Sequence, residues 1–289
     1  MQEILEILSL PIVSRLLVVG ILVSLCAALL GVSLVLKRYS MIGDGLSHVG
    51  FGALALSSAL PIGTVFRDVP LLITIPLVVL AAFLLLRLSS KSKIRGDAAI
   101  AIISTGSLAF GSITITLSGG GNNDICNYLF GSITAVTDSD VILSIVLSVV
   151  VIALFVLCYH KIFAVTFDET FAKATGVKTS FFNMLIAFLT AITIVLGMRM
   201  MGAVLISSLI IFPALTSMRV CKAWESVIIC SAAVSVICFI AGFLISALIE
   251  IPTAARAVSL PTGATIVSVN VLAFLLFWLF SLVKRKIKR

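Results

Sequence analysis

The 289-residue sequence has few charged residues and only two histidines. Asp, Glu, Lys and Arg together make up 11% of the chain, whereas 61% of it is hydrophobic. The mean hydropathy is +1.29. A soluble core cannot accommodate so much apolar surface, but a chain with many membrane-spanning segments requires it. The composition therefore predicts an all-α, polytopic membrane protein.

Two motifs that would indicate enzymes are absent. No G-x-x-x-x-G-K-[ST] occurs, so the chain has no P-loop with which to hydrolyse ATP by itself. H-E-x-x-H is also absent, which argues against an intramembrane metalloprotease. A serine hydrolase would need a base beside its serine, but Ser47 and His48 are sequence neighbours and point to different helix faces. We therefore expect no enzymatic activity, and any ATP drive must come from a partner.

Nine apolar runs are suitable for crossing a bilayer as helices. They cover about residues 13–36, 40–60, 70–88, 98–118, 139–159, 180–198, 201–220, 225–249 and 263–283. The count is weakest near Gly197 to Met201, where two runs meet almost without a polar linker, so a kinked or partly re-entrant pair is the alternative. We expect about eight to nine transmembrane helices in one domain over residues 1–289.

The bases that give the net charge of +8 cluster at the ends of apolar runs rather than on one soluble face. This pattern favours a topological role over nucleic-acid binding. By the positive-inside rule, the alternate flanks that hold most bases are cytoplasmic, which places the amino terminus outside and the carboxyl terminus inside. These bases are Lys37, Arg38, Arg87, Lys91, Lys93, Arg95, Lys161, Lys173, Lys178, Arg219, Lys222 and those of residues 284–289. The basic tail 284–289 also favours contact with anionic membrane lipid.

Two metal-type ligands lie inside an otherwise apolar run. At 1.5 Å per residue, a helix that leaves the interface near Arg38 carries Asp44 roughly 9 Å and His48 roughly 15 Å deep. An aspartate at that depth costs about 2.5 to 3.5 kcal/mol, so a functional role is the default hypothesis. The i, i+4 spacing puts both side chains on one face, where they could bind one cation. The alternative is a structural pair that bonds internally or to a neighbouring helix.

A polar segment, Phe167 to Lys178, stands out among the apolar runs. Asp168 and Glu169 can begin a short helix, and Gly176 can cap its end. The predicted topology makes this segment cytoplasmic. It could be a docking surface for another protein or a connector at the lipid interface, and the residues alone do not decide.

Four blocks spread over most of the chain carry a family resemblance. They are Ile42-Gly-Asp-Gly-Leu-Ser-His48, Tyr128-Leu-Phe-Gly-Ser132, Phe167-Asp168 with Ala172 and Gly176-Val177, and Gly202-Ala-Val-Leu-Ile206 through Pro213-Ala214. In this order they resemble the permease subunits of ATP-binding-cassette importers for zinc, manganese or iron(II). Gly45, where such permeases often have alanine or threonine, and the glycines 119–121 depart from the pattern without removing a proposed ligand.

The resemblance implies a multi-pass permease in the cytoplasmic membrane of a prokaryote that moves a divalent metal ion inward. Asp44 and His48 would contact the ion in transit, and no cofactor would be permanently bound. The working assembly would hold two copies of the chain and two cytoplasmic ATPase subunits, and an extracellular or periplasmic metal-binding protein would deliver the ion. The element that docks on the ATPase would contain Phe167, Asp168, Glu169, Ala172 and Gly176.

Other transport functions stay open on the residues alone. A permease for siderophores, haem or cobalamin shares the many-helix plan but would not need the Asp44 and His48 pair in its pore. A proton-driven secondary carrier could use the same pair as a proton relay. Imidazole favours zinc, carboxylate and water favour manganese, and iron(II) tolerates both, so the pair does not choose the metal.

Overall fold

The computed structural model describes residues 11–59, 71–91, 96–119, 121–131, 138–248, 250–252 and 257–287. The long helices are α2 (Pro11–Leu36), α3 (Ser40–Ala59), α4 (Leu71–Lys91), α5 (Gly96–Leu117), α7 (Asp138–Leu157), α10 (Thr179–Met201), α11 (Ala203–Val220), α12 (Trp224–Leu248) and α13 (Thr262–Ile287). The short helices are α6 (Asn122–Phe130), α8 (Tyr159–Phe167) and α9 (Glu169–Ala174). Strands β1 (Glu250–Pro252) and β2 (Ala257–Ser259) pair as an antiparallel hairpin.

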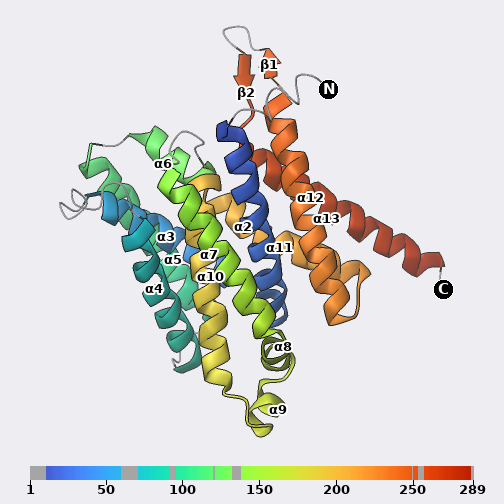
Figure 1. Ribbon diagram of the computed structural model, residues 1–289. Coiled ribbons are helices and arrows are strands. Elements are labelled where there is room, and N and C mark those ends of the chain that lie inside the picture. Colours follow the sequence, from blue (N-terminus) through green and yellow to red (C-terminus); the bar gives the residue numbers. More distant parts are fainter. Residues whose placement is uncertain are drawn as a thin grey trace.

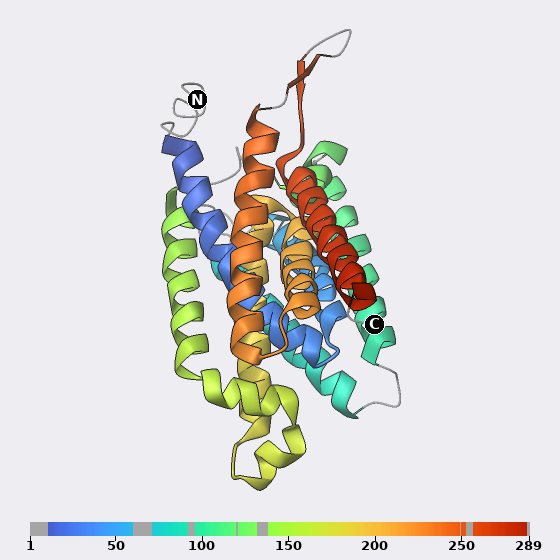
Figure 2. The same cartoon turned by 90° about the vertical axis from the view of Figure 1, so that its right-hand side faces the viewer.

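The long helices lie side by side and alternate in direction (Figures 1 and 2). The start of α2, the short helix α6 and the hairpin lie at one end, which we call the hairpin end. Helices α8 and α9 lie at the opposite end, which we call the α9 end. The connections at 37–39, 158–178 and 221–223, all predicted to be cytoplasmic, meet at the α9 end. The structure thus has the alternation that the basic flanks predict.

Within the described residues, seven helices are long and apolar enough to cross a membrane. These stretches are Val13–Leu36, Ala98–Leu117, Asp138–Leu157, Thr179–Met198, Ala203–Val220, Trp224–Leu248 and Thr262–Lys284, and α4 contains a shorter apolar stretch, Thr74–Leu84. The expected count of eight to nine is therefore supported only as far as seven spans and one shorter candidate. Helix α3 is not among them, because Asp44 and His48 lower the hydropathy of its run.

Helices α10 and α11 are joined by one residue, Gly202. Its φ of +87° lies in the left-handed region, and a Cβ there would lie 2.4 Å from the carbonyl oxygen of Leu129. The chain reverses so tightly that a Cβ at Gly197 would meet the side chain of Ile206 at 2.5 Å. The two apolar runs near 201 are therefore separate helices, and only glycine fits both the backbone angle and the space at their junction.

Helix α11 occupies the centre of the bundle and contacts α2, α3, α10, α12 and α13. Small residues allow this close packing: a Cβ at Gly31 of α2 would lie 2.0 Å from the carbonyl oxygen of Ile210. Hydroxyl groups also join helices, since Ser235 of α12 donates to the Ser24 carbonyl of α2 at 2.9 Å. These contacts hold α2, α11 and α12 together, and α3 packs against α11 in the same core.

Among the described residues, α6, α8 and the hairpin are not predicted from the sequence. Helix α6 begins at Asn122, directly after the glycines 119–121, and its polar start hides it from a search for apolar runs. The hairpin pairs Glu250 with Ser259 and Pro252 with Ala257, so the all-α prediction holds except for this short ribbon.

Candidate functional site

Asp44 and His48 lie on the same side of α3, one helical turn apart. The distance from His48 Nε2 to Asp44 Oδ2 is 3.8 Å, which is longer than a hydrogen bond. The Asp44 side chain is 48% exposed and that of His48 is 21% exposed, so the pair opens outward from the packed interior. The direct hydrogen bond of the structural-pair interpretation is therefore not formed.

The separation suits two ligands of one ion. Carboxylate oxygen and imidazole nitrogen bind zinc at about 2.1 Å, so two ligand atoms on one ion can be at most about 4.2 Å apart. The 3.8 Å between Nε2 and Oδ2 lies inside that limit. Within the described residues, no group of three His, Cys, Asp or Glu side chains could hold a metal ion, so this pair supplies an incomplete shell.

The second nitrogen of His48 is not held in place. Nδ1 is buried and has no hydrogen-bond partner among the described residues. Metal-binding histidines usually donate their other N–H to a partner, and loss of that partner typically weakens metal affinity by about 10- to 100-fold. An imidazole without this support suits a site that must release its ion.

The neighbours of α3 show where the pair faces. Gly43 and Ser47 lie against α11, at Ile210 and Ser207 respectively. On another side, a Cβ at Gly45 would touch Ile100 of α5 at 2.6 Å. At 100° per residue, Asp44 and His48 point between these two contacts. The pair therefore faces the side of α3 that lies between α5 and α11.

The contacts of Ser47 indicate a structural role in α3 rather than a catalytic one. Its hydroxyl donates to the Asp44 carbonyl at 2.7 Å and lies 3.2 Å from the hydroxyl of Ser207 on α11. Ser207 in turn donates to the Ala203 carbonyl at 2.9 Å. These contacts direct Ser47 toward α11, on a different face from His48, as the sequence interpretation expected.

The predicted polar helix at 167–178 is confirmed as α9 with its two caps. The Asp168 carboxylate accepts from the N–H of Phe171 at 2.9 Å, which makes Asp168 the N-cap. At the other end Gly176 has a φ of +82°, and the N–H of Val177 donates to the Ala172 carbonyl at 3.0 Å. Ala172 is fully buried, so the segment is anchored on one side.

The other side of this segment is exposed. Phe167 and Phe171 are 58% and 64% exposed at the α9 end. Phe167 and Phe163 pack against Trp224 of α12, with ring centroids 5.6 and 5.5 Å from the indole. Sequence reasoning missed Trp224, because the contact joins segments more than fifty residues apart and no local pattern marks it. The result is an apolar surface at the end predicted to be cytoplasmic.

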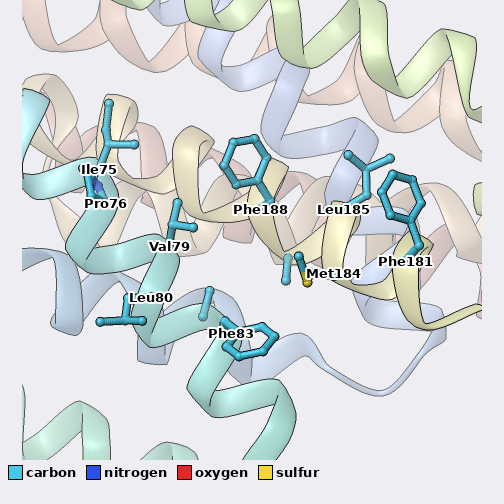
Figure 3. A pocket seen from close by; sticks show the side chains of 11 residues that line it. Ile75, Pro76, Val79, Leu80, Phe83, Phe181, Met184, Leu185 and Phe188 are labelled. Carbon is cyan, nitrogen blue, oxygen red and sulfur yellow. The ribbon is translucent and has the colours of Figure 1, made fainter.

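A separate groove of about 710 Å³ lies between α4 and α10 and has an apolar lining (Figure 3). It is lined by Ile75, Pro76, Val79, Leu80, Ala82, Phe83, Phe181, Met184, Leu185, Ala187 and Phe188. Neither Asp44 nor His48 contributes to it. A groove without polar side chains offers no ligand to a metal ion, so it is not the candidate ion site.

Comparison with known proteins points to one family. Residues 9–281 match the sequence profile of the family described as "ABC 3 transport family". The chain is 32% identical over 199 residues to the high-affinity zinc uptake system membrane protein ZnuB of Buchnera aphidicola, which covers 68% of this chain and 74% of that protein. It is 29% identical over 207 residues to the manganese import system permease protein ScaB of Streptococcus gordonii, covering 72% of each.

A solved structure has the same architecture. PsaBC from Streptococcus pneumoniae, determined in complex with Fab, matches with a TM-score of 0.81 and 26% identity. The match covers 96% of this chain and 95% of that one.

Proposed function

Because the chain belongs to the ABC 3 transport family, it is the membrane permease of an ABC importer of zinc or manganese, and we propose that the ion passes Asp44 and His48. The observation that carries this proposal is the open pair itself. A carboxylate and an imidazole 3.8 Å apart, without a hydrogen bond between them, can share one cation. The metal ion is the substrate, and ATP is hydrolysed by a separate subunit.

The metal is zinc or manganese on the strength of the relatives, and iron(II) stays a prediction from ligand chemistry alone. Family membership displaces the siderophore, haem or cobalamin importer and the proton-driven carrier as interpretations. The open Asp44 and His48 pair also argues against a permease for large metal chelates, because such a substrate would not need two side chains that bind a bare metal ion.

The working assembly in this proposal has two permeases and two ATPase subunits, and an extracellular or periplasmic binding protein delivers the ion. The incomplete shell and the 48% exposure of Asp44 support a second copy, because further groups must approach the open side of α3. We place the α9 end in the cytoplasm of a prokaryotic cell, with the carboxyl terminus inside, on the basis of Lys37, Lys173, Lys178 and Lys222. In this proposal the nine long helices of the described residues all cross the membrane, α3 and α4 included.

Phe167, Asp168, Glu169, Ala172 and Gly176 belong to the segment that we assign to ATPase docking. Its caps make it a rigid projection, and its exposed phenylalanines offer apolar contact area. ATP binding would then move this segment and shift α3 between outward-open and inward-open arrangements.

The test is ATP-dependent uptake of radiolabelled zinc, manganese and iron(II) into proteoliposomes that contain the permease, its ATPase subunit and its binding protein. We expect uptake of zinc or manganese that is lost in Asp44→Ala and in His48→Gln, with membrane insertion and ATPase association retained. Asp138→Asn is the matched control, because this aspartate lies at the hairpin end and pairs with Arg15.

Each contrary result has a distinct meaning. Unchanged uptake in Asp44→Ala would remove the pair from the ion path. Failure of both variants to assemble would support the structural-pair interpretation, and uptake that needs no ATPase would favour the proton-driven carrier.

A further inference from the structure

The amide of Asn183 bridges two charged residues from distant parts of the chain. Lys37 Nζ, just after α2, donates to Asn183 Oδ1. Asn183 Nδ2, in the first turns of α10, donates to Glu169 Oε1 at 3.1 Å. The ammonium fixes which end of the amide faces it, and the carboxylate fixes the other end, so only one orientation of Asn183 serves both partners.

Lys37 and Glu169 are connected through the two hydrogen bonds of the Asn183 amide. Within the described residues, no direct ion pair joins the two charged groups. Lys37 is half-buried, and burial lowers the pKa of its ammonium while the Glu169 carboxylate partly opposes that effect. A partly desolvated ammonium needs its acceptor, because an unpaired buried charge is costly. Replacement of the Asn183 amide would therefore break the hydrogen-bonded connection between Lys37 and Glu169.

Lys37 also lies at the start of a closed turn between α2 and α3. The N–H of Arg38 donates to the Val35 carbonyl at 3.1 Å, and that of Tyr39 donates to the Leu34 carbonyl at 2.8 Å. This is a Schellman motif, and Arg38 supplies its left-handed residue with a φ of +61°. These bonds close the turn on the end of α2, and the N–H of Ile42 in α3 donates to the Tyr39 carbonyl at 2.9 Å, so the same turn is also bonded to the first turn of α3. A displacement of Lys37 therefore moves the first residues of α3 as well.

The Glu169 end of the bridge lies in the docking segment. Glu169 is the first residue of α9 and follows the N-cap Asp168 directly. At the near end, Ser40 begins α3 and Asp44 follows one helical turn later. The bridge therefore connects the segment assigned to ATPase docking with the helix that carries the ion ligands, at the end of the molecule where both begin.

We propose that Lys37 and Asn183 are positioning residues that transmit movement of α9 to α3 and so couple ATP hydrolysis to ion passage at Asp44 and His48. This inference rests on the proposed function. The bridge is polar, so it can break and re-form between two arrangements, whereas the packing of Gly50 in α3 against the Met198 side chain of α10 contains no polar bond.

The test uses the permease purified with its ATPase subunit and reconstituted with the binding protein, and it measures ions transported per ATP hydrolysed. Asn183→Leu and Lys37→Met should lower this ratio roughly tenfold, in the range found for residues within coupling networks. Lys37→Arg keeps a donor and should retain most of the ratio. Lys222→Met, which removes an exposed base at the same end of the molecule but outside both the bridge and the docking segment, is the matched control.

Zinc binding without ATP separates coupling from damage to the ion site, because it should stay equal to wild type in both loss variants. A wild-type ratio in Lys37→Met and Asn183→Leu would overturn the inference while leaving the proposed function intact. An equal loss in Lys222→Met would overturn it as well. If wild-type uptake itself does not depend on Asp44, the proposed function fails and the bridge fails with it.

Discussion

The hydroxyl oxygens of Ser47 and Ser207 lie 3.2 Å apart and join α3 to α11 next to the ion ligands. Both residues are buried. Each hydroxyl has one proton, so one serine donates to the other while the second donates to a backbone carbonyl of its own helix. The contact holds the inner side of α3 against the central helix. Helix α3 is thus held to α11 on the side of Ser47, while the side chains of Asp44 and His48 are partly exposed on another side.

Removal of this contact should weaken the fold more than the transport. We expect Ser47→Ala to lower the free energy of unfolding by about 1 kcal/mol, the worth of one buried hydrogen bond between helices. Ser207→Ala should cost a similar amount, and the double variant should cost less than the sum because both remove one contact. Thermal unfolding in detergent measures these differences, and loss of activity at unchanged stability would instead revive a catalytic role for Ser47.

Gly45 should tolerate alanine poorly and larger residues worse. A Cβ at Gly45 meets Ile100 Cγ2 at 2.6 Å, so the isoleucine must shift and α3 must move away from α5. Overpacking of this kind costs about 1 to 3 kcal/mol. Ile100→Ala, which removes Cγ2, should recover part of the loss in a Gly45→Ala background. Equal thermal stability of Gly45→Val and wild type would show that this contact is loose.

Gly202→Ala should be among the most damaging glycine substitutions. At a φ of +87° and a ψ of 158° the backbone lies in a region that is essentially restricted to glycine and costs other residues about 1 to 3 kcal/mol, and the new Cβ would lie 2.4 Å from a carbonyl oxygen. The matched control is Gly106→Ala on α5, where a Cβ meets nothing within 4 Å. Yield of folded protein and unfolding temperature should fall sharply for the first and stay level for the second. Similar values for both would contradict the packing at the junction of α10 and α11.

The N-cap of α9 gives a graded test of the docking segment. Asp168→Ala removes the acceptor for the Phe171 N–H and should destabilise α9 by about 1 kcal/mol, whereas Asp168→Asn should keep most of the cap. ATPase association should weaken in the alanine variant and stay near normal in the asparagine variant. If both associate normally, either the cap or the docking role is wrong, and local protease sensitivity of 167–178 tells which.

Local signals were enough to predict several features. The Asp44 and His48 pair stands out because a carboxylate in an apolar run is costly, and the i, i+4 spacing places both on one face without knowledge of the fold. The caps of α9 at Asp168 and Gly176 depend on residues within one short segment. The helix runs follow from hydropathy alone, and they agree with the long helices to within a few residues.

Contacts between segments that are distant in the sequence could not be predicted, because no local sequence pattern indicates them. The bridge through Asn183 joins residues separated by 146 positions in the chain, and an asparagine near a helix start is unremarkable in sequence. Trp224 meets Phe163 only because α11 brings the polypeptide back to the α9 end, where α12 begins. The further ligands of the ion also stay unpredicted, because within the described residues no side chain completes the shell.

The one-residue junction at Gly202 also determines where the chain can change in length. One inserted residue would rotate α11 by about 100° and move Ser207 away from Ser47. By contrast, Gly121 between α5 and α6 has open space around it. A fluorescent label or epitope for following transport belongs at that connection, because there it leaves the helices around the ion path in register.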